Sequence, residues 1–203
     1  MSRIHDQDLT IFSPEERDAV QFYGSQIHEH ATVHLNYTTY DIRCEQDTVN
    51  VSNEHCNIMM YSRGNNMHPY LYARVIGVFH AKVYYPGTIQ GDRMDFLWVR
   101  WFECNTSLLS GWDAYTMDRI SFVPRVPGDA DDSAFSFVNP ADVIRSCHLM
   151  PCWEKGRTKD YLGRSQFRHE DGDFRYYWVN RYLFHLSLMC CHLTHDITIE
   201  QVC

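Results

Sequence analysis

Aromatic side chains are the residues here best suited to recognising a ligand, with 13 Tyr and 5 Trp in a chain of 203 residues. A methylated ammonium group is held over the faces of roughly two to four rings, because the ring quadrupole attracts a cation. The candidates for such a cage are Tyr84, Tyr85, Trp98, Trp112 and Tyr115, with Asp113 or Asp118 as counter-charge. Indole rings are usually packed in a core, and Trp98 and Trp101 also fit that role. Trp112 follows a glycine in an expected loop and is the strongest binding candidate.

Cysteine and histidine give a weaker signal for a metal site. Cys147, His148 and Cys152 lie close together in the sequence. A second group consists of Cys190, Cys191, His192 and His195. Zinc needs four converging ligands, usually in two closely spaced pairs, and the spacing of the first group is too long. No CxxC motif occurs among the eight cysteines, so free thiols are expected, with no metal and no cofactor.

Catalytic motifs are missing from the sequence. It contains no HExxH, no GxSxG and no phosphate-binding GxxxxGK[ST] pattern. No catalytic residue is therefore predicted, and the chain is not expected to be an enzyme. The competing enzyme hypothesis is a fragment of a transposase-type nuclease, in which Asp41, Asp95 and Asp142 would form an acidic cluster.

The charge balance argues against a dedicated duplex-DNA binder. The chain has 18 Lys and Arg against 26 Asp and Glu, a net charge of −8, whereas phosphate recognition requires a basic excess. Stacking and charge from Arg74, Lys82, Arg100 and Arg119 leave single-stranded nucleic acid as a minor mode. A basic run consists of Lys155, Arg157, Lys159, Arg164 and Arg168. That run either faces an acidic partner or belongs to a solvated loop of mixed charge.

The N-terminal third is expected to be a mixed arm. Ser13 and Pro14 resemble a helix start, and residues 17–30 show some helical periodicity, interrupted by Gly24. Residues 31–40 are rich in β-branched and aromatic side chains, which predicts a strand. Residues 41–69 are polar, with Asn, Asp and Ser clusters, and are expected to be irregular.

Strand patterns dominate from residue 70 onward. Residues 71–85 and 94–102 are strong strand runs joined by a short polar link, which predicts an antiparallel hairpin. In the second run, Leu97, Val99 and Trp101 share one face, and the intervening residues share the other. Further strands are expected at residues 120–123, within 135–149, and at 175–184 as a closing strand.

These elements predict a mainly β fold with sparse helix, built as a small barrel behind an irregular N-terminal arm. The expected divisions are the arm at residues 1–69, the barrel at 70–184 and a divergent tail at 185–203. No apolar stretch approaches the roughly 18 residues that a membrane span needs, and no signal peptide is evident. A soluble, intracellular protein is expected.

Three blocks of this barrel resemble the bromo-adjacent homology (BAH) domain, which has an SH3-like barrel. Residues 72–79 (YARVIGVF) are similar to its opening strand, and residues 98–102 (WVRWF) to its central V-x-W-F strand. Residues 139–149 (NPADVIRSCHL) are similar to its I-x-G-K-C segment and precede the aromatic strand at 176–182. Arg145 and Ser146 stand in place of the glycine and lysine, so that turn is expected to differ.

The chain also resembles, over residues 30–184, a fungal domain of proteins associated with Kyakuja-Dileera-Zisupton transposons. The similar segments are residues 36–41 (NYTTYD), 93–102 (RMDFLWVRWF) and 110–112 (SGW). After Phe184 the resemblance ends, which suggests a truncated or altered C-terminus.

The two resemblances imply a non-catalytic, nuclear interaction module in chromatin or transposon proteins. BAH domains bind nucleosomes, modified histone tails or partner proteins, so a histone tail or nucleosome surface is the expected partner. Other domains of the same transposon-associated protein are further expected partners. No family binding residue carries over, and the binding candidates remain Trp98, Trp112, Tyr115, Tyr84 and Asp113. A decayed domain without a ligand is the third hypothesis.

Overall fold

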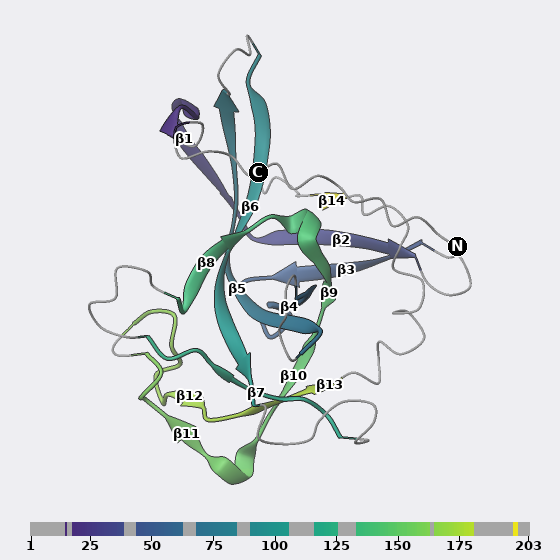
Figure 1. The fold of residues 1–203 in the computed structure, drawn as a ribbon, viewed down its shortest axis with the longest axis vertical. Coiled ribbons are helices and arrows are strands. Elements are labelled where there is room, and N and C mark those ends of the chain that lie inside the picture. The colour runs from purple at the N-terminus through teal and green to yellow at the C-terminus, as the bar shows by residue number, and fades with distance from the viewer. Residues whose placement is uncertain are drawn as a thin grey trace. The chain divides into compact units, whose positions relative to one another are not determined.

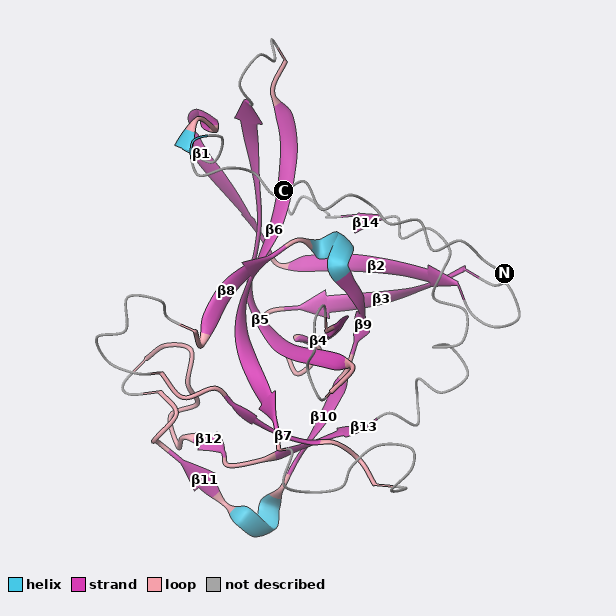
Figure 2. Cartoon of the chain, in the orientation of Figure 1, coloured by secondary structure: helices cyan, strands magenta, loops and turns pink. Residues whose placement is uncertain are grey.

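A computed structural model describes Glu15 and residues 18–38, 44–62, 68–84, 90–105, 116–125, 133–162, 165–180 and 197–198. Within these residues the fold is mainly β, and no helix reaches seven residues. Figure 2 shows strands throughout, joined by loops and short helical turns. None of the helices in the described part of the chain is long and apolar enough to cross a membrane.

The described residues include strands β1 to β14 and two short 3-10 helices, and Glu15 and Asp18 are helical as well. The first strands are β1 (Gln21–His30), β2 (Thr32–Thr38), β3 (Cys44–Asn50), β4 (Asn57–Tyr61), β5 (Tyr70–Tyr84) and β6 (Asp92–Cys104). Next come β7 (Arg119–Phe122), β8 (Phe135–Val138), η1 (Pro140–Asp142), β9 (Val143–Ser146), β10 (His148–Pro151) and η2 (Trp153–Lys155). The last are β11 (Arg157–Thr158), β12 (Asp173–Phe174), β13 (Tyr177–Asn180) and β14 (Ile197–Thr198).

Nine strands form one sheet, in the order β10-β13-β7-β6-β5-β4-β9, with β1 pairing with β5 and β8 with β6. Figure 1 shows β5 and β6 at the centre of this arrangement. No closed barrel is formed by the strands that are described. The two end strands, β9 and β10, are nevertheless successive segments separated only by Cys147. One stretch of chain therefore pairs with β4 by its first half and with β13 by its second half.

Two smaller sheets accompany the main one. Strand β2 pairs with β3 from Thr32↔Asn50 to Thr38↔Cys44 and also with β14. Strand β11 pairs with β12.

The chain divides into two compact units, which are described separately. The first comprises residues 1–28 and 80–94, and the second comprises residues 29–79 and 95–203. In the first unit, the ring of Tyr23 lies 5.8 Å from that of Tyr84, and Lys82 Nζ lies 5.3 Å from the Tyr23 centroid. His28 stacks on His80 at 4.7 Å.

Two hydrophobic clusters form the interior of the second unit, and β6 contributes to both. The aliphatic core consists of Val33, Leu35, Val49, Ile58, Met60, Ala73, Val75, Val78, Leu97, Val99, Val138 and Val143, with Trp101 packed against it. The aromatic core consists of Met59, Tyr72, Phe102, Ile120, Phe122, Ile144, Cys147, Leu149, Phe174, Tyr177 and Val179. The alternation predicted for residues 97–102 is confirmed, since Leu97 and Val99 enter one cluster and Phe102 the other.

The second unit also buries an ion pair between Arg100 and Asp173. Arg100 is fully buried, and its Nη2 lies 2.8 Å from Asp173 Oδ2. Its guanidinium also lies 3.6 Å from the Phe122 ring centroid, and Nη1 donates to Phe167 O at 3.2 Å. Burial lowers the pKa of the Arg100 guanidinium, and the Asp173 carboxylate opposes that change.

Two further networks join distant segments. Asp118 is buried, accepts a hydrogen bond from Tyr72 Oη at 2.8 Å and lies 2.9 Å from His68 Nε2. Arg145 binds both carboxylate oxygens of Asp47, at 3.1 and 3.2 Å, and so connects β9 to β3.

Several sequence predictions are confirmed, and two are wrong. Residues 31–40, 71–85, 94–102 and 120–123 contain the predicted strands β2, β5, β6 and β7. The helix expected over residues 17–30 is wrong for β1, where the chain is extended. There Gly24 has φ +62°, outside the helical region, and rings from β5 pack on Tyr23 and His28.

Residues 41–69 are also less irregular than expected. Strand β3 pairs along its whole length with β2, and β4 pairs with β5 and β9. The polar composition of β3 reflects its largely exposed side chains. The polar composition therefore did not indicate β3, because this strand is stabilised by its pairing with β2 and not by burial of apolar side chains.

Candidate functional site

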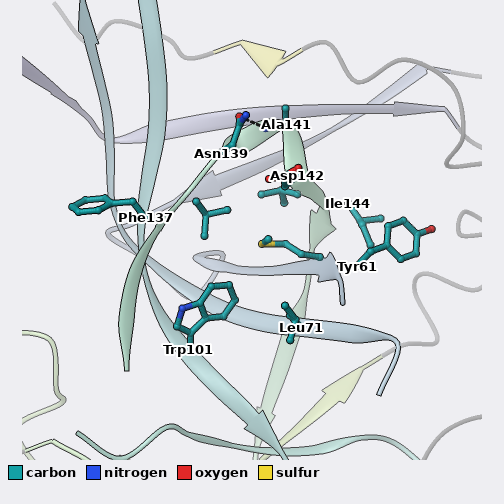
Figure 3. A pocket seen from close by; sticks show the side chains of 11 residues that line it. Tyr61, Leu71, Trp101, Phe137, Asn139, Ala141, Asp142 and Ile144 are labelled. Carbon is teal, nitrogen blue, oxygen red and sulfur yellow. Dashed lines mark hydrogen bonds between the residues drawn. The ribbon is translucent and has the colours of Figure 1, made fainter. Parts of the chain in front are cut away.

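A hollow of about 480 Å³ lies in the second unit, and we call it the β8–β9 hollow. Its lining residues are Met60, Tyr61, Leu71, Trp101, Phe137, Val138, Asn139, Ala141, Asp142, Val143 and Ile144. They come from β4, β5, β6, β8, η1 and β9. Figure 3 shows Phe137 and Tyr61 on opposite sides, with Asn139 and Asp142 along one flank and Trp101 and Leu71 along the other.

The polar flank of the hollow is formed by the turn that leads from β8 into β9. Asn139 Oδ1 accepts from Ala141 N at 3.0 Å, and Asn139 O accepts from Asp142 N at 2.9 Å. Pro140 has the fixed φ suited to the first position of such a turn. The Asn-Pro-Ala-Asp sequence therefore caps η1 and places Asp142 on the wall of the hollow.

Trp101 is held in one orientation on the opposite flank. Its Nε1 donates to Ser136 Oγ at 2.7 Å, and its backbone N donates to Ala134 O at 2.9 Å. Since the only polar atom of the indole is already hydrogen-bonded, the ring offers an apolar surface to the hollow.

An irregularity in the sheet shapes one wall. The pairing of β4 with β9 runs through Met59↔Arg145 and Met60↔Val143, so Ile144 is an extra residue between them. Such a bulge bends its strand locally and redirects side chains. Met60, Val143 and Ile144 all line the hollow as a result.

Phe137 also belongs to a surface of aromatic rings on the outer side of β6 and β8, which we call the outer aromatic strip. Its rings form two groups, Phe79, Phe96 and Phe137 with centroids 5.6 Å apart, and Trp98, Phe135 and Phe167 with centroids 4.8 to 6.2 Å apart. The two groups meet where Trp98 lies opposite Phe137 in the pairing of β6 with β8. Phe137 is 67% exposed. The strip therefore continues from the rim of the hollow onto a partly exposed sheet face.

The five binding residues predicted from the sequence fall in different places. Trp98 is half-buried in the outer aromatic strip, and its indole packs on Phe167 at 4.8 Å. Tyr84 is half-buried in the other compact unit, beside Tyr23. Trp112, Asp113 and Tyr115 lie outside the described residues, as does Tyr85. The alternative counter-charge, Asp118, is buried against Tyr72 and His68.

The residues of the nuclease and zinc hypotheses are only partly described. Asp95 and Asp142 are described, whereas Asp41 and the second cysteine-histidine group are not. In the described ranges, no three His, Cys, Asp or Glu side chains are placed to hold a metal ion. Burial raises the pKa values of the Cys56 and Cys147 thiols, which favours the neutral form over a metal-binding thiolate.

The hollow was not predicted from the sequence. Trp101 was expected to be a core residue, and Asp142 was considered only as a carboxylate of the nuclease hypothesis. One pattern in the sequence could have indicated the site. Residues 135–138 (FSFV) alternate like a strand and are followed by Asn139 and Pro140, which favour a tight turn, so Phe137 is placed at the end of a strand close to that turn.

Comparison with known proteins adds no identification. No family model, no curated protein and no solved structure matches this chain.

Proposed function

We propose that this chain is a non-catalytic protein-interaction module that binds an extended basic segment, such as a histone tail, in the β8–β9 hollow. The observation that carries the proposal is the lining itself, in which apolar and aromatic side chains lie opposite Asn139 and Asp142. Pockets that bind ligands are typically apolar, with a few placed polar groups that fix orientation.

The charge of the hollow selects the occupant. Asp142 contributes a carboxylate, and the described lining residues include no Lys, Arg or His. A lysine side chain matches this pattern, because its aliphatic stem packs on Trp101 and Leu71 while its ammonium group stays near Asp142. The whole chain, with net charge −8, also attracts a basic partner.

The exposed rings on two sides of the hollow favour a chain segment over a single small ligand. Phe137 and Tyr61, which are 67% and 45% exposed, lie at its two sides. A bound segment that contacts both rings would extend from the outer aromatic strip across the hollow. Aromatic side chains supply much of the binding energy at protein interfaces.

The proposed fold is a BAH-like barrel in a nuclear, transposon-associated chromatin protein. Its support is the continuous stretch of β9 and β10, which supplies both end strands of the main sheet. That stretch contains the segment similar to the I-x-G-K-C block. The family, nuclear location and histone partner rest on the motif resemblance and remain parts of this proposal.

The test is a histone-peptide array, followed by fluorescence anisotropy with the labelled peptides that bind. Phe137→Ser is expected to weaken binding about tenfold, the effect typical of an interface anchor. Asp142→Asn is expected to have a smaller effect and to reduce the salt dependence of binding. Phe22→Ser is the matched control, since Phe22 is 48% exposed and belongs to the other compact unit.

Two outcomes contradict the proposal. One is that no basic peptide binds to a chain whose amide spectrum shows it to be folded, which favours a decayed domain. The other is that a peptide binds the Phe137→Ser variant as tightly as it binds the original chain.

A further inference from the structure

Strand β8 is paired along one edge only in the described part of the chain. It runs antiparallel to β6, from Leu97↔Val138 to Arg100↔Phe135, and no other described strand pairs with it. An unpaired edge presents backbone N–H and C=O groups that can hydrogen-bond to a further strand. The second edge of β8 is therefore a place where an extended segment can be added.

The register shows which backbone groups point to that edge. Trp101 N donates to Ala134 O at 2.9 Å, so these two opposite residues form a hydrogen-bonded pair. In an antiparallel ladder such pairs alternate with non-hydrogen-bonded pairs. Ser136 therefore directs its backbone N–H and C=O groups to β6, whereas Phe135 and Phe137 direct theirs away from it.

The outward groups have no partner among the described residues. The backbones of Phe135 and Phe137 form no hydrogen bond with a described residue outside β6. Phe135 is half-buried and Phe137 is exposed, so β8 lies at the surface. No charged side chain or proline of β8 protects the edge from pairing. The two phenylalanines thus offer a short ladder, with one N–H and one C=O group each.

The β8–β9 hollow lies along this edge. Successive side chains of a strand point to opposite faces, so Phe137 and Val138 lie on different faces of β8. Both nevertheless line the hollow, which therefore reaches the edge that separates the two faces. Because β6 occupies the other edge, the edge that borders the hollow is the unpaired one. Figure 3 shows Phe137 of β8 and Ile144 of β9 on opposite sides of the space that an added strand would enter.

A strand added here would present alternate side chains to two different surfaces. One set shares the face of Ser136, whose Oγ accepts from Trp101 Nε1, and meets the lining that includes Asp142. The other set shares the face of Phe135 and Phe137 and meets the outer aromatic strip. The first surface combines an apolar ring with a carboxylate, and the second is apolar.

We infer that the segment bound in the β8–β9 hollow is added to β8 as a β-strand in which basic side chains alternate with apolar ones. This inference rests on the proposed function and specifies its partner. Each basic side chain packs its stem on Trp101 and keeps its charge near Asp142, and the apolar side chains between them pack on the outer aromatic strip. Backbone hydrogen bonds to Phe135 and Phe137 hold the segment whatever its sequence, so the alternation supplies the selectivity.

A basic segment fits this edge better than a second copy of the chain. Exposed strand edges can pair with one another, but two copies that each carry a net charge of −8 repel. The described lining of the hollow contains Asp142 and no Lys, Arg or His, so it attracts a basic segment.

The first test measures fluorescence anisotropy of a labelled peptide of four Lys-Val repeats with the whole chain. In an extended peptide the N–H groups of the lysines point to one side and those of the valines to the other. Two further peptides carry N-methyl groups either on the central lysines or on the central valines, which removes donors and leaves the charge unchanged. One methylated peptide is expected to bind about tenfold more weakly than the unmodified peptide, and the other to bind within about twofold of it.

The same comparison reports the direction of the added strand. In antiparallel addition, the peptide residue opposite Phe137 shares its face and directs its own N–H to β8, so methylation of the valines weakens binding. In parallel addition, the neighbouring residues direct their N–H groups to β8, so methylation of the lysines weakens binding.

The second test removes one donor from the protein. Phe137→Ser deletes the ring, whereas Phe137→Pro deletes the ring and the outward N–H. Proline is tolerated at an edge position whose N–H is unpaired, so the pairing with β6 is kept. Phe137→Pro is expected to bind the unmodified peptide about fivefold more weakly than Phe137→Ser does. If the amide spectrum shows that Phe137→Pro is unfolded, the peptide comparison decides the inference, because it needs no variant.

Equal binding of the two methylated peptides, whether both bind or neither does, overturns the inference. Equal binding by folded Phe137→Pro and Phe137→Ser variants overturns it as well. A concentration-dependent dimer that Phe137→Pro dissociates, without peptide binding, would assign the edge to a second copy. The proposed function survives these results if Phe137→Ser still weakens the binding of basic peptides, and both proposals fail if no basic peptide binds to the folded chain.

Discussion

The aliphatic core and the aromatic core share β6 but are stabilised in different ways. The aliphatic core contains Val, Leu, Ile, Met and Ala side chains, whose burial stabilises the fold without directional contacts. In the aromatic core, Arg74 and Arg100 lie 4.9 and 3.6 Å from the Phe122 centroid, and Arg100 pairs with Asp173. Directional contacts of this kind specify one arrangement of rings and loops.

Each core supports a different exposed part of the molecule. Met60, Val138 and Val143 of the aliphatic core line the β8–β9 hollow. Phe174 of the aromatic core supports Trp153 and Arg157. The shape of the hollow therefore depends on how closely the apolar side chains of its wall pack. The aromatic core depends in addition on the buried ion pair between Arg100 and Asp173.

Asp173→Asn is expected to have the largest effect on stability. It removes the charge that compensates the fully buried Arg100 guanidinium, and an uncompensated buried charge costs about 3–5 kcal/mol. The free energy of unfolding from urea denaturation measures this loss. Asp171→Asn, two residues away in the same loop and 79% exposed, is the control and should change stability by less than about 0.5 kcal/mol. Equal effects of the two variants would show that the ion pair does not hold the aromatic core.

Leu97→Ala tests the aliphatic core in the same way. Leu97 is fully buried, and truncating such a leucine costs about 2–5 kcal/mol, depending on how far the site collapses. Leu97→Met keeps the volume and should cost less than about 1.5 kcal/mol. A methionine variant as unstable as the alanine variant would mean that shape, and not burial, governs this core.

The sequence could predict the strands whose pattern is local. Residues 97–102 are apolar at every position except Arg100, the pattern expected of a strand whose two faces are both buried or half-buried. In β1 the deciding contacts come from β5, more than fifty residues away, where His80 and Tyr84 pack on His28 and Tyr23. No local pattern reports such partners, so a weak helical periodicity misled the prediction.

The exposed parts of the molecule were still harder to predict. The β8–β9 hollow combines residues from six elements, and its wall depends on the bulge at Ile144. The basic run from Lys155 onward was visible in the sequence, but the exposure of Trp153 at its start was not. Trp153 differs from Trp98 only by its surroundings, which are set by tertiary packing.

A third contact, between Tyr37 and Arg145, attaches the β2–β3 hairpin and gives the smallest predicted effect. The Arg145 guanidinium lies 3.7 Å from the Tyr37 centroid, and Tyr37 Oη donates to Glu45 Oε2 at 2.6 Å. Burial, reinforced by the hydrogen bond to Glu45, raises the pKa of Tyr37 from 10.0 to about 12. The folded state therefore keeps the phenol proton at pH values where the unfolded chain has lost it.

The resulting contribution to stability is fully present below pH 10 and is lost as the pH rises from 10 to 12. Between pH 9 and pH 11, the stability of the original chain relative to the Tyr37→Phe variant should fall by about 1 kcal/mol. Urea denaturation at the two pH values measures it. Because burial also raises the pKa values of Tyr161 and Tyr177, only the difference between the two proteins isolates Tyr37. A difference that stays constant from pH 9 to pH 11 would place the Tyr37 hydroxyl in water, so that only the contact of its ring with Arg145 attaches the hairpin.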